Sequence, residues 1–501
     1  AQQHADYAAL REVEIANSVP PALDFHPPAP PSISAPAPAS PTLPAIATPT
    51  EGELPFASIA TQAVLLRNRQ ISALELADMY LARLERYDPA LHCVITRTAE
   101  LARAQAQRAD AELAAGRDRG ALHGIPWGAK DLLATRKIPT TWGAGPYRNQ
   151  VPEEDAEVVR RLHAAGAVLA AKLTMGELAW GDVWFGEMTR NPWNLADGSS
   201  GSSAGSASAV VAGLVGFTIG SETWGSIVSP STRCGATGLR PTFGRVSRAG
   251  AMALSWSMDK LGPICRSVED CALVFHAIHG PDGRDTSASA PFAWQPRASL
   301  HGVRIGMLER AFAESYDNRE HDMRTLAVLE QLGAELVPIS LPDLPIQSMG
   351  FILMAEAAAA FDTLTRSNRD DELVRQVEDA WPNRLRAARF IPAVEYIQAN
   401  RLRTLAFEAL VRWVAPINGS LAGQLARQRA PLRAARTRGV LRPLHDGGRS
   451  HAAPLLGPPG QGSGRAAGAG RSDRPPAGRS DRPGPAPRPG CGPRGPRSHA
   501  R

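Results

Sequence analysis

Apolar residues recur at intervals of three and four through the first part of the chain and then gather into short unbroken runs. The first pattern is typical of helices with one buried face, and the second is typical of strands buried in a sheet. It predicts helices over 59–69, 74–87 (with Ser72 as N-cap), 97–113, 155–165, 326–334, 356–363 and 402–414, and strands over 125–129, 167–172, 302–308 and 335–339. We therefore expect an α/β fold with a mixed central sheet covered by helices on both faces.

The composition changes sharply at both ends of the chain. Residues 1–26 form an amphipathic extension, and 27–52 are a Pro/Ala-rich linker in which extended, disordered backbone is expected. An enzyme domain is predicted over 53–423. Residues 424–501 contain 16 Arg, no Lys, 13 Pro and 14 Gly, a composition that cannot bury a core.

This tail, 424–501, carries a net charge of +13, whereas the whole chain carries +6, which leaves −7 for the rest. One interpretation is a basic arm that binds nucleic acid or another anionic surface. The interpretation that we favour is a shifted reading frame in a GC-rich gene, because the composition breaks abruptly after Gly423. Resequencing the native gene tests it.

Composition and cysteine usage exclude several other classes. Hydrophobic residues make up 43% and charged residues 21%, as in soluble globular proteins, and no apolar run is long enough to cross a bilayer. The five cysteines are odd in number and lack metal-ligand spacing, so neither a disulfide framework nor a metal site is predicted. No cofactor is implied. A cytoplasmic location is favoured slightly, and secretion or a periplasmic location stays open if a signal peptide preceded Ala1.

Two Gly/Ser segments stand out, a loop over 198–206 and a turn that ends at Ser226. Glycine has no side chain, so such loops can point several backbone N–H groups into one cavity. Phosphate binding is disfavoured because Gly205 is not followed by Lys and then Ser or Thr. A flexible linker and a Gly-x-Ser-x-Gly nucleophile elbow around Ser203 are the alternatives, and the elbow is disfavoured because 191–198 is rich in turn residues and is not predicted to be a strand.

These segments resemble the motifs of the amidase signature family. The loop Ser-Gly-Ser-Ser-Ala-Gly-Ser over 200–206, the turn Trp-Gly-Ser over 224–226 and Gly-Ile-Pro-Trp-Gly-Ala-Lys-Asp over 124–131 fit the family's three motifs in order and spacing. The resemblance extends from about residue 53 to about residue 423. In the family the nucleophile follows the relay serine by 24 residues, which selects Ser202 as the partner of Ser226.

The resemblance implies that Lys130 is the base, Ser202 a proton relay held by a cis peptide, and Ser226 the nucleophile. A Ser hydroxyl needs a base to take its proton, and a buried Lys can serve because burial disfavours the ammonium form. The family also implies an oxyanion hole made by the backbone N–H groups of Thr223, Trp224, Gly225 and Ser226. We expect an amidase that hydrolyses a carboxamide through an acyl-serine intermediate.

Two residues depart from the family pattern, since Trp224 replaces a Gly and Val228 replaces an Arg. We expect the first to reshape the acyl pocket and the second to alter an internal ion pair. Met175 and Trp180 are candidate substrate-binding residues.

Two other functions stay open. One is a glutaminase subunit of a tRNA-dependent amidotransferase, and the other is an inactive truncated amidase with a basic arm. The expected partner is a small-molecule amide; a homodimer stays open, no membrane contact is expected, and nucleic acid is expected only through the tail.

Overall fold

The computed structural model describes residues 2–22, 49–287, 292, 294, 299–316 and 318–414. The predicted tail and most of the predicted linker therefore lie outside the described residues. Within the described ranges, no helix is both long enough and apolar enough to cross a membrane.

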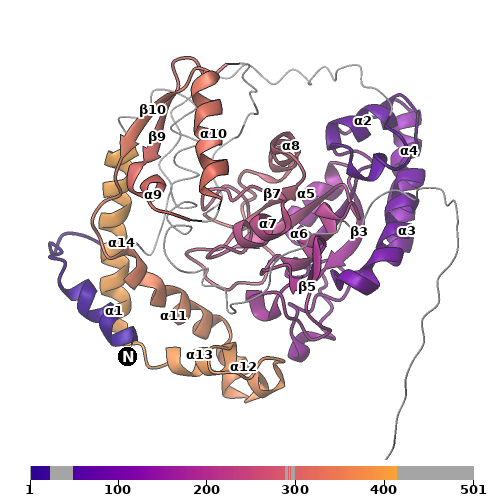
Figure 1. The fold of residues 1–501 in the computed structure, drawn as a ribbon. Helices are drawn as coiled ribbons and strands as arrows, with labels where there is room; N and C mark the ends of the chain where they lie inside the picture. The colour runs from indigo at the N-terminus through magenta and orange to yellow at the C-terminus, as the bar shows by residue number, and fades with distance from the viewer. Residues whose placement is uncertain are drawn as a thin grey trace, which may run out of the picture. The chain divides into compact units, whose positions relative to one another are not determined.

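A six-stranded mixed sheet forms the centre of the fold (Figure 1). Its spatial order is β1 (Val94–Arg97), β3 (Val168–Leu173), β2 (Pro126–Lys130), β6 (Phe217–Glu222), β8 (Lys260–Cys265) and β7 (Thr237–Gly238). Strands β3, β2 and β6 run parallel to one another, whereas β1 is antiparallel to β3, and β8 is antiparallel to both β6 and β7. The prediction of a mixed α/β sheet is confirmed.

Every residue of β2, β3, β6 and β8 is buried. Strands that are covered on both faces need continuous apolar runs, and this is the pattern that the sequence shows there. The rings of Trp127 and Phe217 stack across β2 and β6 with centroids 6.0 Å apart. Polar residues in these strands, such as Lys130 and Lys172, are therefore exceptions that need partners inside the protein.

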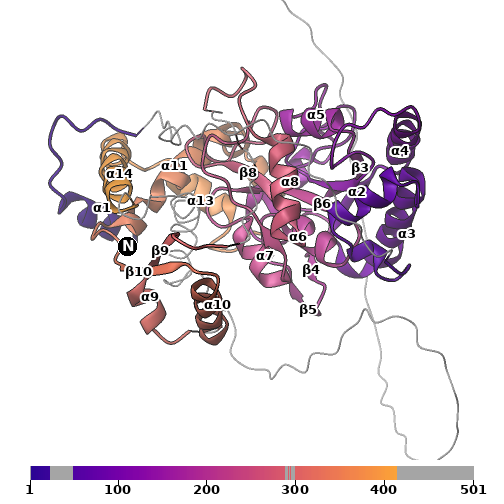
Figure 2. The same ribbon diagram turned by 90° about the horizontal axis from the view of Figure 1, so that it is seen from above.

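Helices from the first half of the chain pack on this sheet. They are α2 (Ile59–Arg67), α3 (Ala73–Leu91), α4 (Ala99–Ala114), α5 (Glu157–Ala164), α6 (Ala204–Val211), α7 (Val228–Cys234) and α8 (Val268–Ile278). The predicted cap is confirmed, because Ser72 and Glu75 form a reciprocal capping box at the start of α3. Helices α3 and α4 pack against β3, beyond which both views place them (Figures 1 and 2), and α6 packs across β2, β3, β6 and β8.

A short hairpin precedes the Gly/Ser loop. It consists of β4 (Arg190–Asn191) and β5 (Asn194–Gly198), paired antiparallel. The prediction that 191–198 is not a strand was wrong, because backbone pairing extends a segment that has no alternation of apolar and polar residues. The hairpin is separate from the central sheet, so the loop does not begin at the edge of that sheet as a nucleophile elbow would.

The second half of the chain adds a small parallel sheet and a group of helices. Strands β9 (Arg304–Leu308) and β10 (Glu335–Ile339) pair in parallel, with α9 (Glu309–Ala313) and α10 (Arg319–Gln331) between them in sequence. Then follow α11 (Phe351–Ala360), α12 (Asp362–Arg366), α13 (Trp381–Ala388) and α14 (Ala393–Val414). The predicted strand over 335–339 is confirmed, and the predicted helices over 326–334 and 356–363 lie several residues later than the observed α10 and α11. The 3-10 helices are η1 (Leu54–Phe56), η2 (Gly145–Tyr147), η3 (Glu177–Ala179), η4 (Ile346–Gly350) and η5 (Arg369–Glu372).

The N-terminal extension is a packed element and not a solvated preface. Helix α1 (Gln2–Arg11) lies beside α14 in both views (Figures 1 and 2). The rings of Tyr7 and Phe351 meet edge to face with centroids 5.0 Å apart, and Thr404 Oγ1 donates to the Pro20 carbonyl over 2.8 Å. Residues near the two ends of the described chain therefore share a small apolar core.

Candidate active site

Two parallel strands of the central sheet end beside each other at the site. Lys130 is the last residue of β2, and Ser221 lies next to the last residue of β6. Ala129 is paired with Ile219 in the parallel ladder, so the residues that follow both strands emerge at the same edge. The loop that precedes α6 crosses this edge and brings Ser202 and Ser203 to the lysine.

The Lys130 ammonium or amine is surrounded by three serine hydroxyls. Lys130 Nζ lies 2.8 Å from Ser202 Oγ, 3.0 Å from Ser203 Oγ and 2.8 Å from Ser221 Oγ. The Lys130 side chain is fully buried, and this burial lowers its pKa well below the usual value for lysine, although the carboxylates of Asp259 and Glu222 oppose the shift. The neutral amine is therefore favoured at this position.

The hydrogen bonds around Ser203 fix the direction of one of these contacts. Ser203 Oγ donates to the Ser221 carbonyl over 3.1 Å and accepts from the Ser221 N–H over 3.1 Å. Its proton is thus committed, so Ser203 accepts an N–H bond from Lys130. A neutral amine has two N–H donors and one lone pair, which leaves one donor and the lone pair for Ser202 and Ser221. The lone pair can take a proton from Ser202.

The loop that carries Ser202 is held by the segment after Trp180. The Ser200 N–H donates to Asp182 Oδ2 over 2.9 Å, and the peptide bond between Gly201 and Ser202 is cis. A Cβ on Gly201 would lie 1.8 Å from the Gly181 carbonyl oxygen, so only glycine fits there. This close approach explains one glycine of the Gly/Ser loop.

Ser226 sits in a tight turn between β6 and α7. Gly225 has a φ of 106°, which glycine adopts far more readily than other residues. Within the described part of the chain, the backbone N–H groups of Trp224, Gly225 and Ser226 donate no hydrogen bond to protein. They are therefore free to meet an oxygen atom from a ligand.

The structure brings two of the three predicted catalytic side chains into direct contact. Lys130 and Ser202 are hydrogen-bonded, and the Ser226 carbonyl accepts from the Ser203 N–H over 3.1 Å. Among the described residues, the Ser226 hydroxyl forms no hydrogen bond with Ser202 or Lys130. Ser226 is partly exposed, whereas Lys130 and Ser202 are fully buried. The arrangement places a buried basic group behind a serine that a ligand can reach.

A buried carboxylate holds the turn from behind. Glu222 Oε2 accepts from the N–H groups of Ile227 and Val228, each over 2.9 Å, and Glu222 Oε1 lies 3.1 Å from Arg240 Nε. Arg240 thus supplies an ion pair to Glu222 in a chain that has Val228 where the family has Arg. Sequence reasoning missed Arg240, because it lies in the segment 234–246 that was interpreted as structural support.

The predicted pocket residues differ in accessibility. The Trp224 side chain is 38% exposed and its ring faces Gly350, at the start of α11. Met175 is fully buried in the main core. Trp180 is half-buried and meets the Trp381 ring edge to face, with centroids 4.7 Å apart. A role of Met175 or Trp180 in substrate binding stays a prediction.

Two buried charged residues behind the turn were also missed. Asp259 Oδ1 accepts from Thr223 Oγ1 over 2.5 Å, and burial raises the pKa of Asp259. Lys260 donates to the Met258 carbonyl, and burial lowers its pKa to about 7. The only sequence signal for them is the presence of adjacent Asp and Lys just before an apolar strand.

Comparisons with known proteins agree with this geometry. The family model described as Amidase matches residues 75–407. One relative, from the glutamyl-tRNA(Gln) amidotransferase of Roseiflexus sp. (strain RS-1), is a subunit that is 42% identical over 304 residues, which cover 59% of this chain and 62% of that protein. The corresponding subunit from Marinomonas sp. (strain MWYL1) is 39% identical over 330 residues, covering 63% and 68%. The match to the Roseiflexus protein spans slightly less than two thirds of that protein's length.

Solved structures show the same relationship. The native peptide amidase from Stenotrophomonas maltophilia superposes with a TM-score of 0.63 at 30% identity, covering 72% of this chain and 82% of that one. A protein described as part of a vestigial complex related to an s-triazine catabolic enzyme gives a TM-score of 0.66 at 30% identity, covering 72% and 79%. Because the family model matches well over half of the chain and the fold agrees, this chain belongs to the amidase family of amidase signature enzymes.

Proposed function

We propose that this protein is an amidase that hydrolyses a carboxamide C–N bond through an acyl-serine intermediate on Ser226. The observation that carries the proposal is the fully buried Lys130 Nζ, 2.8 Å from Ser202 Oγ, at the strand edge that faces the Ser226 turn. Burial favours the neutral amine, and a neutral amine can act as a general base.

The proposed reaction begins with two proton transfers. As Ser226 Oγ attacks the carbonyl carbon, its proton passes to Ser202, and the Ser202 proton passes to the Lys130 amine. The carbonyl oxygen becomes an oxyanion, which the N–H groups of the turn from Thr223 to Ser226 stabilise.

The tetrahedral intermediate then collapses. The C–N bond breaks, and the leaving nitrogen receives a proton from Lys130 through Ser202, which restores the neutral amine. Water next attacks the Ser226 ester; it gives its proton to the same relay and releases the carboxylic acid. The overall reaction consumes one amide and one water and yields one acid and one amine.

Fluorophosphonate labelling with peptide mapping tests the proposal. We expect a single adduct on Ser226 that is absent in Ser226→Ala and strongly slowed in Lys130→Met. Ser229→Ala is the matched control, because Ser229 lies on α7 close to the turn and its hydroxyl bonds with Ser200, outside the proposed relay; it should label like the wild type. Labelling of another serine, or an unchanged rate in Lys130→Met, would contradict the mechanism.

A second candidate is the ammonia-releasing component of an amidotransferase. The observation that favours it is the name of the relatives described above, which are components of glutamyl-tRNA(Gln) amidotransferases and are 39–42% identical to this chain. Ammonia release from glutamine that appears only when the protein is mixed with the other subunits of such an enzyme would support this function. Hydrolysis of simple amides by the protein alone would favour the first candidate.

A further inference from the structure

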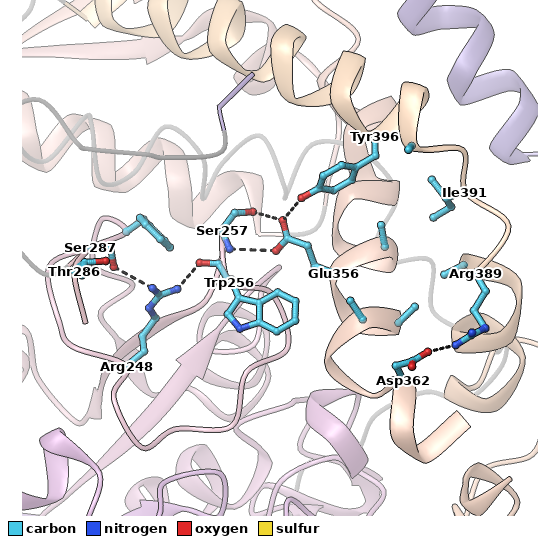
Figure 3. A pocket seen from close by; sticks show the side chains of 16 residues that line it. Arg248, Trp256, Ser257, Thr286, Ser287, Glu356, Asp362, Arg389, Ile391 and Tyr396 are labelled. Atoms are coloured by element: carbon cyan, nitrogen blue, oxygen red, sulfur yellow. Dashed lines mark hydrogen bonds and ion pairs between the residues drawn. The ribbon is translucent and has the colours of Figure 1, made fainter. Parts of the chain in front are cut away.

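A cavity of about 690 Å³ lies between the loops after β7 and β8 and the C-terminal helices (Figure 3). The proposed proton relay uses none of its lining residues. One wall is the loop that carries Trp256 and Ser257, and the other consists of α11 and the segment from α13 to α14. Much of its lining is apolar or aromatic and comes from Phe243, Trp256, Ala355, Ala358, Ala359 and Tyr396.

The loop wall is fixed to the turn that carries Ser226. Asp259 accepts from Thr223 Oγ1 through Oδ1 over 2.5 Å, and through Oδ2 it accepts from the N–H groups of Leu254 and Ser255 over 2.8 and 2.9 Å. One buried carboxylate therefore joins the turn to the residues that lead directly into Trp256. The cavity and the turn share a rigid support.

The helix wall is also next to the turn. The Trp224 ring faces Gly350, and a Cβ on that glycine would lie 3.5 Å from the ring. Gly350 is the residue before α11, and α11 supplies the alanines of the cavity wall. Two independent contacts thus place both walls beside the turn, so a substrate held by Ser226 can extend into the cavity.

The carboxylate in the cavity wall is already fully engaged. Glu356 accepts from Ser255 Oγ over 2.5 Å, from Ser257 Oγ over 2.6 Å and from the Tyr396 hydroxyl over 3.1 Å (Figure 3). Arg403 donates to Ser257 Oγ over 2.8 Å behind this group. Glu356 is thus held in place by the protein and has little capacity left for the ammonium group of a ligand.

The arginines of the wall are engaged as well. Arg248 Nε lies 2.8 Å from Asp285 Oδ2, and Arg248 also donates to the Trp256 carbonyl. Arg389 pairs with Asp362 (Figure 3). A carboxylate from a ligand would have to displace one of these internal partners, and an unpaired buried charge is costly.

We propose that this cavity binds the part of the substrate distant from the scissile amide and that it accepts a neutral group bearing an aromatic ring. The Trp256 side chain is 52% exposed and faces α11 (Figure 3), so an aromatic group between them would bury apolar surface on both sides. The inference rests on the proposed amidase function. It assigns the protein to neutral aryl-substituted carboxamides and not to zwitterionic substrates such as glutamine.

Binding to the Ser226→Ala variant tests this assignment without turnover. Isothermal titration would compare 4-phenylbutyramide, a neutral aromatic amide, with L-glutamine. We expect the aromatic amide to bind and glutamine to bind at least about tenfold more weakly. Adding Trp256→Ala should weaken binding of the aromatic amide by about tenfold, whereas Trp256→Phe, which keeps a ring, should retain most of the affinity.

Two results would overturn the assignment: glutamine binding as tightly as 4-phenylbutyramide, or Trp256→Ala binding the aromatic amide as well as Trp256→Phe does. Thermal unfolding of each variant checks that the fold is intact. Failure of the proposed function has a different signature, because it appears as a missing fluorophosphonate adduct on the wild-type protein.

Discussion

Glu177 carries a buried carboxyl group whose protonation is coupled to stability. It lies in η3 and is 4% exposed, and its two oxygens are 3.1 and 3.0 Å from the Val374 N–H, which donates to them. The Trp381 indole donates to the Glu177 carbonyl over 3.1 Å. Burial raises the pKa of Glu177 to about 7, although the backbone hydrogen bonds oppose this shift.

The size of the effect follows from this pKa. The ordinary value is 4.5, and one pKa unit corresponds to about 1.4 kcal/mol, so the ionised side chain costs about 3 kcal/mol of folding free energy. Between the two pKa values the folded state holds a proton that the unfolded state has lost, so stability falls as pH rises through this window. The penalty is absent below the unfolded pKa and complete above pH about 7.

Glu177→Gln removes this titration while keeping an oxygen that can accept from the Val374 N–H. We expect the stability of the variant relative to the wild type to rise by about 3 kcal/mol between about pH 4 and about pH 8. Urea unfolding followed by tryptophan fluorescence at several pH values measures the difference. A difference that stays constant across this range would refute the reasoning.

Glu75→Gln is a control of opposite sign. The pKa of Glu75 is lowered, chiefly by the hydrogen bond from the Ser72 N–H in the capping box, and its side chain lies at the surface. Its contribution to stability is present above the unfolded pKa and is lost as pH falls. The stability of Glu75→Gln relative to the wild type should therefore fall as pH rises.

Three further predictions concern stability and the pocket. Lys172→Met should lower the free energy of unfolding by about 3–5 kcal/mol, because it leaves Asp131, 3.0 Å away and fully buried, without its ion-pair partner; adding Asp131→Asn should restore much of the loss, and additive losses in urea unfolding would contradict this. Ser72→Ala should cost about 1 kcal/mol in the same assay through loss of the N-cap, and no change would count against a stabilising role for the cap. Trp224→Ala should speed labelling by bulky fluorophosphonates more than by small ones, and equal effects would show that the ring does not narrow the site.

Local patterns were sufficient where neighbouring residues decide the structure. Ser72 caps α3 because its partner is only three residues away, and the strand over 335–339 is an apolar segment that follows Gly333. In contrast, β5 has little apolar content and exists because it pairs with Asn191 and Arg190. Its five residues alone gave no indication of a strand.

The candidate site was only partly predictable for the same reason. Lys130 and Ser202 were found through spaced motifs, but Ser203 and Ser221 reach the lysine only through the pairing of β2 with β6 and the path of the loop before α6. Lys172 lies opposite Ala129 in the parallel register, which brings it to Asp131. Partners of this kind depend on sheet register, and one-dimensional spacing does not contain it.

The packing of α1 on α14 has a consequence for biosynthesis. Thr404 and Pro20 are 384 positions apart, and Arg11 pairs with Glu395 across the same separation. During translation, α1 therefore emerges long before its docking surface and must wait, with Tyr7 and Leu10 uncovered, until α14 has left the ribosome. Contacts of such long range form late and slowly, so we expect this N-terminal helix to be among the last elements to dock and the first to be recognised by chaperones.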